Sequence, residues 1–161
     1  MAVEVFLGIG SNLGDRLSYI LKTLDEIKKL GKVLKISTVY ESKAWGVENQ
    51  NNFLNLVVLF ETKLLPQDLL LHLRAVEKKV GRKERFKWGP REIDIDILLY
   101  GNKIIRTKLL RVPHPFLHER DFFLYPLLEI NPGLVHPLYL KPLKEFNPQN
   151  TLKPFCCILK V

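Results

Sequence analysis

The sequence predicts an α+β fold: a ferredoxin-like sandwich in which helices pack on one face of a largely antiparallel sheet. Two observations lead to this prediction. Hydrophobic periodicity changes along the 161 residues in the order strand, helix, strand, strand, helix, strand. Glycine or proline stands at the expected helix boundaries. With helices on one face, the other face of the sheet is free to form a site together with extra strands and loops.

The N-terminal half alternates between strand and helix patterns. Ala2–Gly10 is rich in Val, Phe and Ile and is expected to be the first strand. Apolar residues then recur at helical spacing up to a stop at Gly31, at Leu13, Leu17, Ile20, Leu21, Leu24 and Ile27. Val33–Tyr40 and Phe53–Phe60 are further β-rich segments, joined by a polar loop at Glu41–Asn52.

The C-terminal half begins with a second helix, which opens at Pro66 and ends before Gly81. Four segments follow: a basic loop at Arg82–Glu92, a strand of clear period two at Ile93–Tyr100, a turn into Lys103–Ile105, and a short helical pattern at His118–Leu128 that Pro126 breaks. Eight of the ten prolines lie from Pro113 onward. We therefore expect one domain, 1–161, with an irregular proline-containing tail at 138–161.

Composition narrows the class of protein. The chain is 47% hydrophobic and 26% charged, which supports a packed core and argues against disorder. No apolar run reaches the ~18 residues of a membrane span, and the apolar start at Met1 has no basic region ahead of it, so we expect no signal peptide. Cys156 and Cys157 are adjacent, which does not fit zinc-finger spacing, and two thiols favour a cytoplasmic location.

A formal net charge of +8 favours binding of phosphate groups or other polyanions. The charge is concentrated: from Lys78 to Arg91 there are seven basic residues and one acid, Glu84. A solvated basic face is the alternative, but this stretch directly precedes a pair of aspartates.

That pair, Asp94 and Asp96, carries the strongest chemical signal. Side chains alternate along a strand, so both carboxylates project from one face while Ile93, Ile95, Ile97 and Leu99 share the other. Their Cα atoms are expected ~6.6–7 Å apart, close enough to repel unless a cation lies between them. Oxygen ligands with room for water and phosphate suit Mg²⁺, and two ions are expected. The alternative is a solvated polar face of an edge strand.

The loop before these aspartates offers cations for a triphosphate, with Trp88 as a lid over a turn at Gly89. Its basic residues are Arg82, Lys83, Arg85, Lys87 and Arg91. Near the N-terminus, Gly8–Gly14 fits neither a dinucleotide-binding motif nor a P-loop. This segment either lines a substrate or caps the first helix through Ser11, Asn12 or Asp15.

Two further segments are candidates for ligand contacts. Phe53 and Asn55 share a strand face, where an aromatic ring and an amide edge suit a flat heterocycle, with Phe122 as an opposing wall. A satisfied core amide is the alternative for Asn55. His114 lies between two prolines and is a candidate donor to a phosphate oxygen, although a lone histidine is more often structural.

Taken together, these residues resemble the 6-hydroxymethyl-7,8-dihydropterin pyrophosphokinase family from about Phe6 to Pro132. The resemblance rests on Leu7-Gly8-x-Gly10-Ser11-Asn12-Leu13-Gly14-Asp15, Tyr40-Glu41-Ser42 with Gly46 and Gln50, Phe53-Leu54-Asn55, Trp88-Gly89-Pro90-Arg91-x-x-Asp94-x-Asp96 followed by Leu98-Leu99-Tyr100-Gly101, and Val112-Pro113-His114-Pro115 with Arg120. It implies pyrophosphoryl transfer from ATP to a pterin alcohol, giving AMP, in folate biosynthesis.

The resemblance also implies roles for individual residues. By analogy with the family, the metal ligands and catalytic residues are Asp94, Asp96, Arg82 and Arg91. The pterin contacts are Ser42, Trp45, Phe53, Asn55, Trp88 and Phe122. The ATP contacts are Glu77, Arg85, Arg91, Leu98, His114 and Arg120. The implied partners are small molecules, with no nucleic acid and no membrane, and the chain is expected to be a monomer.

Three positions depart from the family pattern, and two rival functions stay open. Ala44 stands near a usual proline, Glu84 replaces a loop arginine for which Arg85 is the nearest substitute, and Lys87 replaces an arginine with a planar fork. A nucleotidyl transferase could use the same paired aspartates. An RNA-binding module could use a ferredoxin-like sheet with a basic loop, although this chain lacks an aromatic-rich RNP1-type strand.

Overall fold

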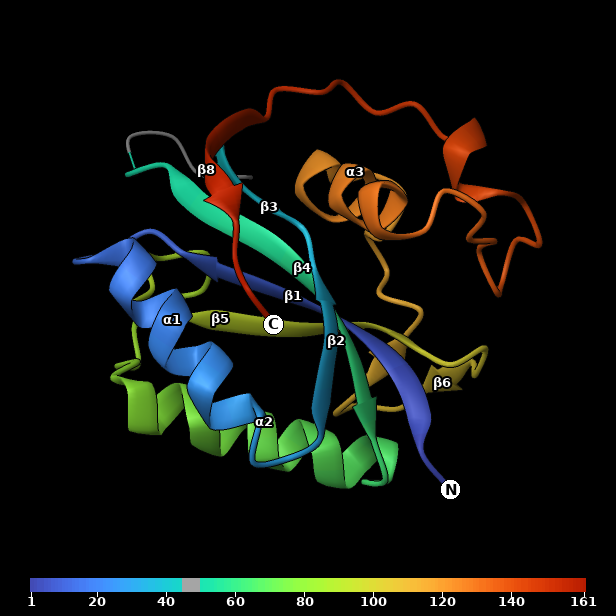
Figure 1. The fold of residues 1–161 in the computed structure, drawn as a ribbon, viewed down its shortest axis with the longest axis horizontal. Helices are drawn as coiled ribbons and strands as arrows, with labels where there is room; N and C mark the ends of the chain where they lie inside the picture. Colours follow the sequence, from blue (N-terminus) through green and yellow to red (C-terminus); the bar gives the residue numbers. More distant parts are fainter. Residues whose placement is uncertain (45–49) are drawn as a thin grey trace.

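The structure is a computed structural model that describes residues 1–44 and 50–161, apart from the side chains at positions 157 and 158. One sheet forms its centre, with the strand order β5-β1-β4-β3-β8 and with β2 also paired to β4 (Figure 1). The paired neighbours are all antiparallel. The six strands are β1 (Val3–Ser11), β2 (Lys32–Ile36), β3 (Thr38–Ser42), β4 (Phe53–Thr62), β5 (Asp94–Tyr100) and β8 (Lys153–Ile158). The prediction of an α+β fold with a largely antiparallel sheet is therefore confirmed.

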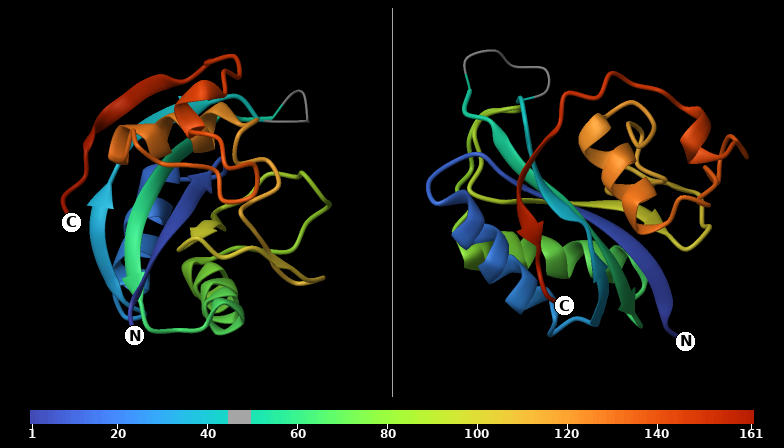
Figure 2. Two further views of the ribbon diagram at one scale, coloured as in Figure 1. Left: turned by 90° about the vertical axis from the view of Figure 1, so that its right-hand side faces the viewer. Right: turned by 45° about the horizontal axis from the view of Figure 1, so that its top comes forward.

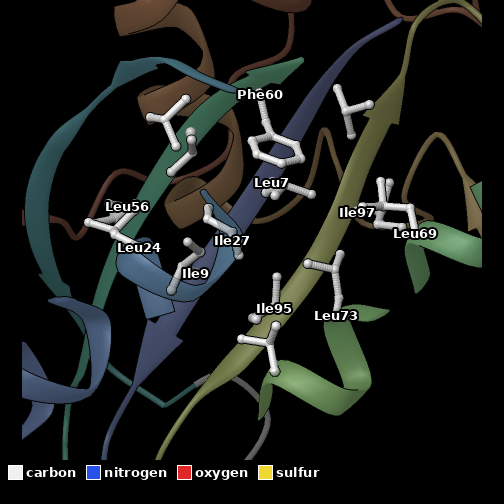
Figure 3. Packing of buried hydrophobic residues seen from close by; sticks show 14 of the residues in the cluster. Leu7, Ile9, Leu24, Ile27, Leu56, Phe60, Leu69, Leu73, Ile95 and Ile97 are labelled. Atoms are coloured by element: carbon white, nitrogen blue, oxygen red, sulfur yellow. The ribbon is translucent and has the colours of Figure 1, made fainter. Parts of the chain in front are cut away.

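Two helices pack on one face of the sheet: α1 (Arg16–Ile27) and α2 (Pro66–Val80) (Figures 1 and 2). They bury the apolar residues that alternate along the strands, among them Leu7, Ile9, Leu56, Phe60, Ile95 and Ile97 (Figure 3). Both helices begin and end where local chemistry favours it. Asp15 accepts a hydrogen bond from Ser18 N and caps α1, and Gly81, with φ of 132°, ends α2.

The third helix, α3 (Asp121–Ile130), lies on the opposite face and covers part of it (Figure 2). It continues through Pro126, where the sequence indicated a break, and buries Leu124 and Leu127 against a second apolar cluster with Val57 and Leu98. The second face of the sheet is therefore only partly free. The site occupies the part that α3 leaves open.

Smaller elements differ from the expectation in instructive ways. The β-rich segment at positions 33–40 divides into β2 and β3 at Ser37, whose hydroxyl accepts from Val57 N. A short hairpin pairs β6 (Ile105–Arg106) with β7 (Arg111–Val112). The C-terminal tail is irregular only in part. It contains a short 3₁₀ helix, Leu143–Glu145, and then crosses over α3 to add β8 to the sheet beside β3 (Figure 1).

Within residues 1–44 and 50–161, no helix has the length and apolar character needed to cross a membrane.

Candidate active site

A pocket of about 430 Å³ lies on the face of the sheet opposite α1 and α2. The residues predicted from sequence that line it are Phe53, Asn55, Trp88, Arg91, Asp94, Asp96, His114, Arg120 and Phe122. They come from β4, β5, the basic loop, the segment before α3 and α3 itself. Residues far apart in the chain thus meet at this pocket.

The floor of this pocket is β1. Gly10 pairs with Asn55 of β4 on one side and with Asp94 of β5 on the other, and Gly8 pairs with Asp96. A Cβ atom at Gly10 would lie 2.8 Å from Asn55 Oδ1, so a side chain there would collide with the amide. The two glycines therefore keep a strip of backbone open between the amide and the carboxylates. Of the two alternatives for Gly8–Gly14, lining the site applies to these glycines, while Asp15 supplies the helix cap.

One side of the pocket presents an amide between aromatic rings. Asn55 has a 6% exposed side chain, and its Nδ2 donates to Ser42 Oγ, which is itself buried. Phe53 and Phe122 line the same pocket. Because Ser42 takes one N–H of the amide, it fixes which way the amide points and leaves Oδ1 and the second N–H for other partners. The amide is thus satisfied by Ser42 and still lines the pocket, so the two alternatives for Asn55 do not exclude each other.

The other side presents the two carboxylates. Arg82 Nη1 lies 3.1 Å from Asp94 Oδ1, and Arg91 Nη1 lies 2.8 Å from Asp94 Oδ2. The ring of His114 approaches Asp96, with Nε2 3.9 Å from Asp96 Oδ1. Burial and the neighbouring charge of Asp94 raise the pKa of Asp96 to about 7. The pair is thus a place where added positive charge is stabilising.

Behind β5, an ion pair between buried Glu77 and partly exposed Arg74 holds Ile95, the residue between the two aspartates. Glu77 is 2% exposed and accepts from Ile95 N at 2.8 Å, while Arg74 Nη1 donates to Ile95 O at 2.9 Å and lies 2.9 Å from Glu77 Oε2. Burial raises the pKa of Glu77. Arg82 also reaches this carboxylate, at 3.0 Å. Glu77 therefore supports the strand from outside the pocket.

One arginine of the basic loop pairs with a carboxylate of the same loop. Arg85 makes two parallel bonds to Glu92, at 2.7 and 2.8 Å, and this partner lowers the pKa of Glu92 to about 2. Neither residue lines the pocket. The loop therefore offers Arg82 and Arg91 to the carboxylates, whereas Arg85 fastens the loop to the residue before Ile93.

His114 and Arg120 close the pocket at the α3 end. His114 Nδ1 accepts from Phe116 N at 3.0 Å, so the proton of the neutral ring sits on Nε2, which faces Asp96. Burial, followed by the charge of Arg120, lowers the pKa of His114 to about 4. The Arg120 guanidinium lies over the rings of Phe116 and Trp88, 4.6 and 5.6 Å from their centroids. Both side chains are thus donors with fixed orientation.

The donor set fits Mg²⁺ held by few protein ligands. Among residues 1–44 and 50–161, no group of three or more His, Cys, Asp or Glu side chains converges as a metal site would require. Mg²⁺ commonly uses one or two carboxylates and completes its shell with water and substrate phosphate. Asp94 and Asp96 supply that number of carboxylates, on one face of a strand and beside a pocket.

Comparison with known proteins gives the family. The chain matches the family model described as 7,8-dihydro-6-hydroxymethylpterin-pyrophosphokinase over residues 6–132. It is 71% identical over 157 residues to the 2-amino-4-hydroxy-6-hydroxymethyldihydropteridine pyrophosphokinase of Aquifex aeolicus, covering 98% of each chain. The chain belongs to this pyrophosphokinase family. It is therefore an ATP-dependent enzyme that transfers a pyrophosphoryl group to a hydroxymethyldihydropterin in folate biosynthesis.

Other members of the family are larger or more distant. The pyrophosphokinase of Bacillus subtilis is 40% identical over 127 residues, which is 78% of this chain and 76% of that one. The folic acid synthesis protein fol1 of Pneumocystis carinii is 45% identical over 135 residues, yet the match spans only 18% of its length. The solved HPPK-DHPS of Plasmodium falciparum with pteroate has a TM-score of 0.70 at 15% identity, over 89% of this chain and 43% of that one. That structural likeness concerns the fold.

Several residues expected from the pyrophosphokinase resemblance do not line the pocket. Ser42 acts on it through Asn55, and Glu77, Arg82 and Arg85 lie around it. Leu98 was expected to contact ATP, but its side chain is fully buried in the second apolar cluster. It is the extra residue of a β-bulge opposite Phe6 and Leu7, and its carbonyl accepts from His114 N. Trp45 lies outside the described residues.

The same bulge corrects one face assignment: Leu99 joins the second cluster and not the one under α1 and α2. At the positions where the chain departs from the family pattern, Ala44 and Lys87 both line the pocket, and Lys87 Nζ lies 5.8 Å from the centroid of the Trp88 ring.

The sequence did not indicate three polar residues around the pocket as site residues. Asn12 is fully buried and bonds to Gln50, Asn51 and Arg91. Gln50 lines the pocket, and Arg16 holds Asn52 O. The sequence signal that could have identified them was Asn12. A buried amide needs several hydrogen-bond partners, whereas a helix cap uses only one.

Proposed function

We propose that the pterin and the ATP phosphates bind on either side of Gly10, the pterin against Asn55 and the phosphates against Asp94 and Asp96. The observation that carries this proposal is the strand register, in which Gly10 pairs with Asn55 on one side and Asp94 on the other. Strands lie ~4.8 Å apart, so the amide and the carboxylates are about two strand spacings apart across bare backbone. That span suits a flat ring joined through a hydroxymethyl group to a phosphate.

On the acceptor side, Asn55 reads the donor and acceptor edge of the pterin, because Ser42 has fixed the orientation of its amide. Phe53 and Phe122 supply aromatic faces for the ring. Trp88 lines the same pocket and excludes water once both substrates are bound. Trp45 is proposed as a further pterin contact on the family resemblance alone.

On the phosphate side, Asp94 and Asp96 would hold the two Mg²⁺ ions. The metal, when bound, neutralises phosphate charge and orients the chain of phosphates. Arg82 and Arg91 already lie within 3.1 Å of Asp94, where their guanidinium groups could contact those phosphates. Arg120 and the Nε2–H of His114 add donors from the opposite wall. Arg85, Glu77 and Leu98 support this arrangement from outside the pocket.

The reaction is an in-line displacement. The pterin hydroxymethyl oxygen forms a bond to the β-phosphorus of ATP, the bond from that phosphorus to the α–β bridging oxygen breaks, and AMP leaves with the bonding electrons. The hydroxyl proton passes to water. His114 does not accept this proton, because the lone pair on its Nδ1 already accepts a hydrogen bond from Phe116 N and its pKa is low. A loose phosphoryl transition state depends on positioning and charge neutralisation more than on a base.

The test is the identity of the products. The protein is incubated with ATP, Mg²⁺ and 6-hydroxymethyl-7,8-dihydropterin, and the nucleotides are separated. We expect AMP and the pterin diphosphate, and we expect Asp94→Asn or Asp96→Asn to reduce turnover by ~10³-fold or more with an unchanged thermal melt. ADP with a monophosphorylated pterin would contradict the assignment of the attacked phosphorus. Pyrophosphate release, with AMP attached to an acceptor, would identify a nucleotidyl transferase, and tight RNA binding without turnover a binding module.

The setting of the enzyme follows from the same proposal. We propose a cytoplasmic monomer that acts on small molecules and binds neither nucleic acid nor membrane. The support for small-molecule substrates is the pocket, and the support for a cytoplasmic location is the pair of thiols, Cys156 and Cys157. Sedimentation of the purified protein would check the monomer.

A further inference from the structure

Asn12 joins the two sides of the pocket through hydrogen bonds. It is 0% exposed and directly follows β1. Its Nδ2 donates to Gln50 Oε1 at 3.2 Å and to Asn51 O at 3.1 Å, on the acceptor side. Its Oδ1 accepts from Arg91 N at 2.8 Å, and its own N–H donates to Arg91 O at 3.0 Å, on the phosphate side. One buried side chain thus uses both ends of its amide, one for each half of the site.

Gln50 adds a second link between the same two segments. Its Nε2 donates to Trp88 O at 2.8 Å. Trp88 has a φ of 67°, in the left-handed region that a bulky residue keeps only where surrounding contacts hold it. The bond from Gln50 is one such contact. The position of the Trp88 backbone therefore depends on the residues just before β4.

Arg91 is the end of this hydrogen-bonded path that lies next to the carboxylates. Its peptide is held on both sides by Asn12, and its guanidinium lies 2.8 Å from Asp94. Gln50, at the other end, lines the pocket beside Phe53. Hydrogen bonds thus connect the acceptor side to the phosphate side, from Gln50 to Asn12 and from Asn12 to Arg91. Gln50 also bonds directly to Trp88.

We propose that Asn12 and Gln50 are positioning residues that make the binding of pterin and ATP mutually favourable. A ligand on one side must hold the segment at positions 50–51, and a ligand on the other must hold Trp88 and Arg91. Because Asn12 and Gln50 tie these segments together, the first ligand to bind orders part of what the second needs. This inference rests on the proposed placement of the two substrates.

Arg16 provides a matched control. Its Nη1 donates to Asn52 O at 2.9 Å and pairs with Glu41 at 2.9 Å, so it anchors the same segment before β4. None of the bonds found for Arg16 in the described part of the chain reaches the basic loop. A substitution there loosens the segment without cutting the link between the two sides.

The experiment measures coupling. The affinity for 6-hydroxymethyl-7,8-dihydropterin is determined by calorimetry with and without Mg²⁺ and α,β-methylene ATP, for the wild type, Asn12→Ala, Gln50→Met and Arg16→Ala. In the wild type we expect the nucleotide to tighten pterin binding by ~5–150-fold. In Asn12→Ala and Gln50→Met this ratio should fall at least ~5-fold toward one. Arg16→Ala should keep the wild-type ratio.

The outcomes separate this inference from the proposed function. An unchanged ratio in Gln50→Met, or an equal fall in Arg16→Ala, would overturn the coupling role while pterin binding itself remained. A wild-type ratio of one would overturn it as well. If the wild type bound no pterin in either condition, the proposed function would fail first. Gln50→Met preserves side-chain length at a partly exposed position, so it decides the question even if Asn12→Ala does not fold.

Discussion

Asn55 illustrates how one residue can serve both packing and recognition. Its side chain is nearly buried between Gly10 and Ser42, and its one committed N–H fixes the direction of the rest of the amide. A buried amide with a free Oδ1 strongly prefers a ligand that supplies the matching donor, since otherwise a buried polar atom loses a partner. Selectivity for a heterocycle with a polar edge follows from this single orientation.

Asn55→Ala should therefore weaken pterin binding by ~10–100-fold and change the affinity for an ATP analogue by less than ~3-fold. Each ligand is titrated separately, so that the coupling between them does not enter. Asn102→Ala, at an exposed turn after β5, is the matched control and should bind both ligands as the wild type does. Equal weakening of both ligands would place Asn55 outside the acceptor site.

At this scale, the sequence predicted the residues whose direction a strand fixes. Alternation alone places Asp94 and Asp96 on one face. The position of Gly8 and Gly10 beside them follows from strand pairing, which the sequence left open. It does not predict which partner a flexible side chain has, as with Arg85, which pairs with Glu92 in this structure. Leu98 shows the limit differently, because a one-residue bulge and the cover of α3 decide its surroundings.

At the scale of elements, the basic loop is held to the strand that follows it and to α2 by arginine–carboxylate pairs. Arg82 bridges Glu77 of α2 and Asp94 of β5, at 3.0 and 3.1 Å. In the proposed reaction, metal and phosphate compete for both partners. The loop must then exchange protein carboxylates for substrate oxygens, which requires it to move.

Hydrogen exchange of the segment 82–91 should therefore slow when Mg²⁺, an ATP analogue and pterin are all present. Arg82→Ala should lower kcat by ~10²-fold or more with a smaller change in KM, because its phosphate contact forms only in the closed state. Lys83→Ala is the control: it removes a charge from the same loop, and no ion pair is found for it among the described residues. Equal losses in both variants would indicate a general charge effect, and unchanged exchange would argue against closure.

Strands and helices with regular periodicity were predictable, and long-range pairing was not. The segment before Ser37 and the segment after it read as one β-rich run, yet Ser37 binds Val57 across the sheet and divides them. The edge strand β8 pairs with β3, more than 100 residues away in the chain. No local sequence pattern near Pro154 predicts pairing with β3. Likewise, α3 continues through Pro126 because its apolar face packs on the sheet.

At the scale of the whole molecule, one sheet separates two apolar layers, and the tail closes the second of them. His136, in the tail, is 2% exposed, and its Nδ1 accepts from the N–H groups of Leu138 and Tyr139, each at 3.2 Å. Its ring stacks on Tyr139 at 4.4 Å and lies 5.4 Å from His118. Burial, followed by the charge of His118, lowers the pKa of His136 to about 4. The fold therefore depends on a neutral imidazole at this position.

The sign of the pH dependence follows directly. An unfolded histidine titrates near ~6.5, so below that pH the unfolded chain binds a proton that folded His136 refuses until about pH 4. Its contribution to the free energy of unfolding is complete above ~6.5 and is lost as the pH falls toward 4. Because His114 titrates in the same direction and Asp96 in the opposite one, the total slope is a sum, and the informative quantity is the difference between variants.

We expect the free energy of unfolding of His136→Gln, measured by urea denaturation from pH 4 to 7.5, to fall less steeply on acidification than that of the wild type. One proton accounts for at most ~1.4 kcal/mol per pH unit of that difference. His72→Gln, at an exposed position of α2, is the control variant. Parallel curves for the wild type and His136→Gln would contradict a lowered pKa for His136 in the folded protein.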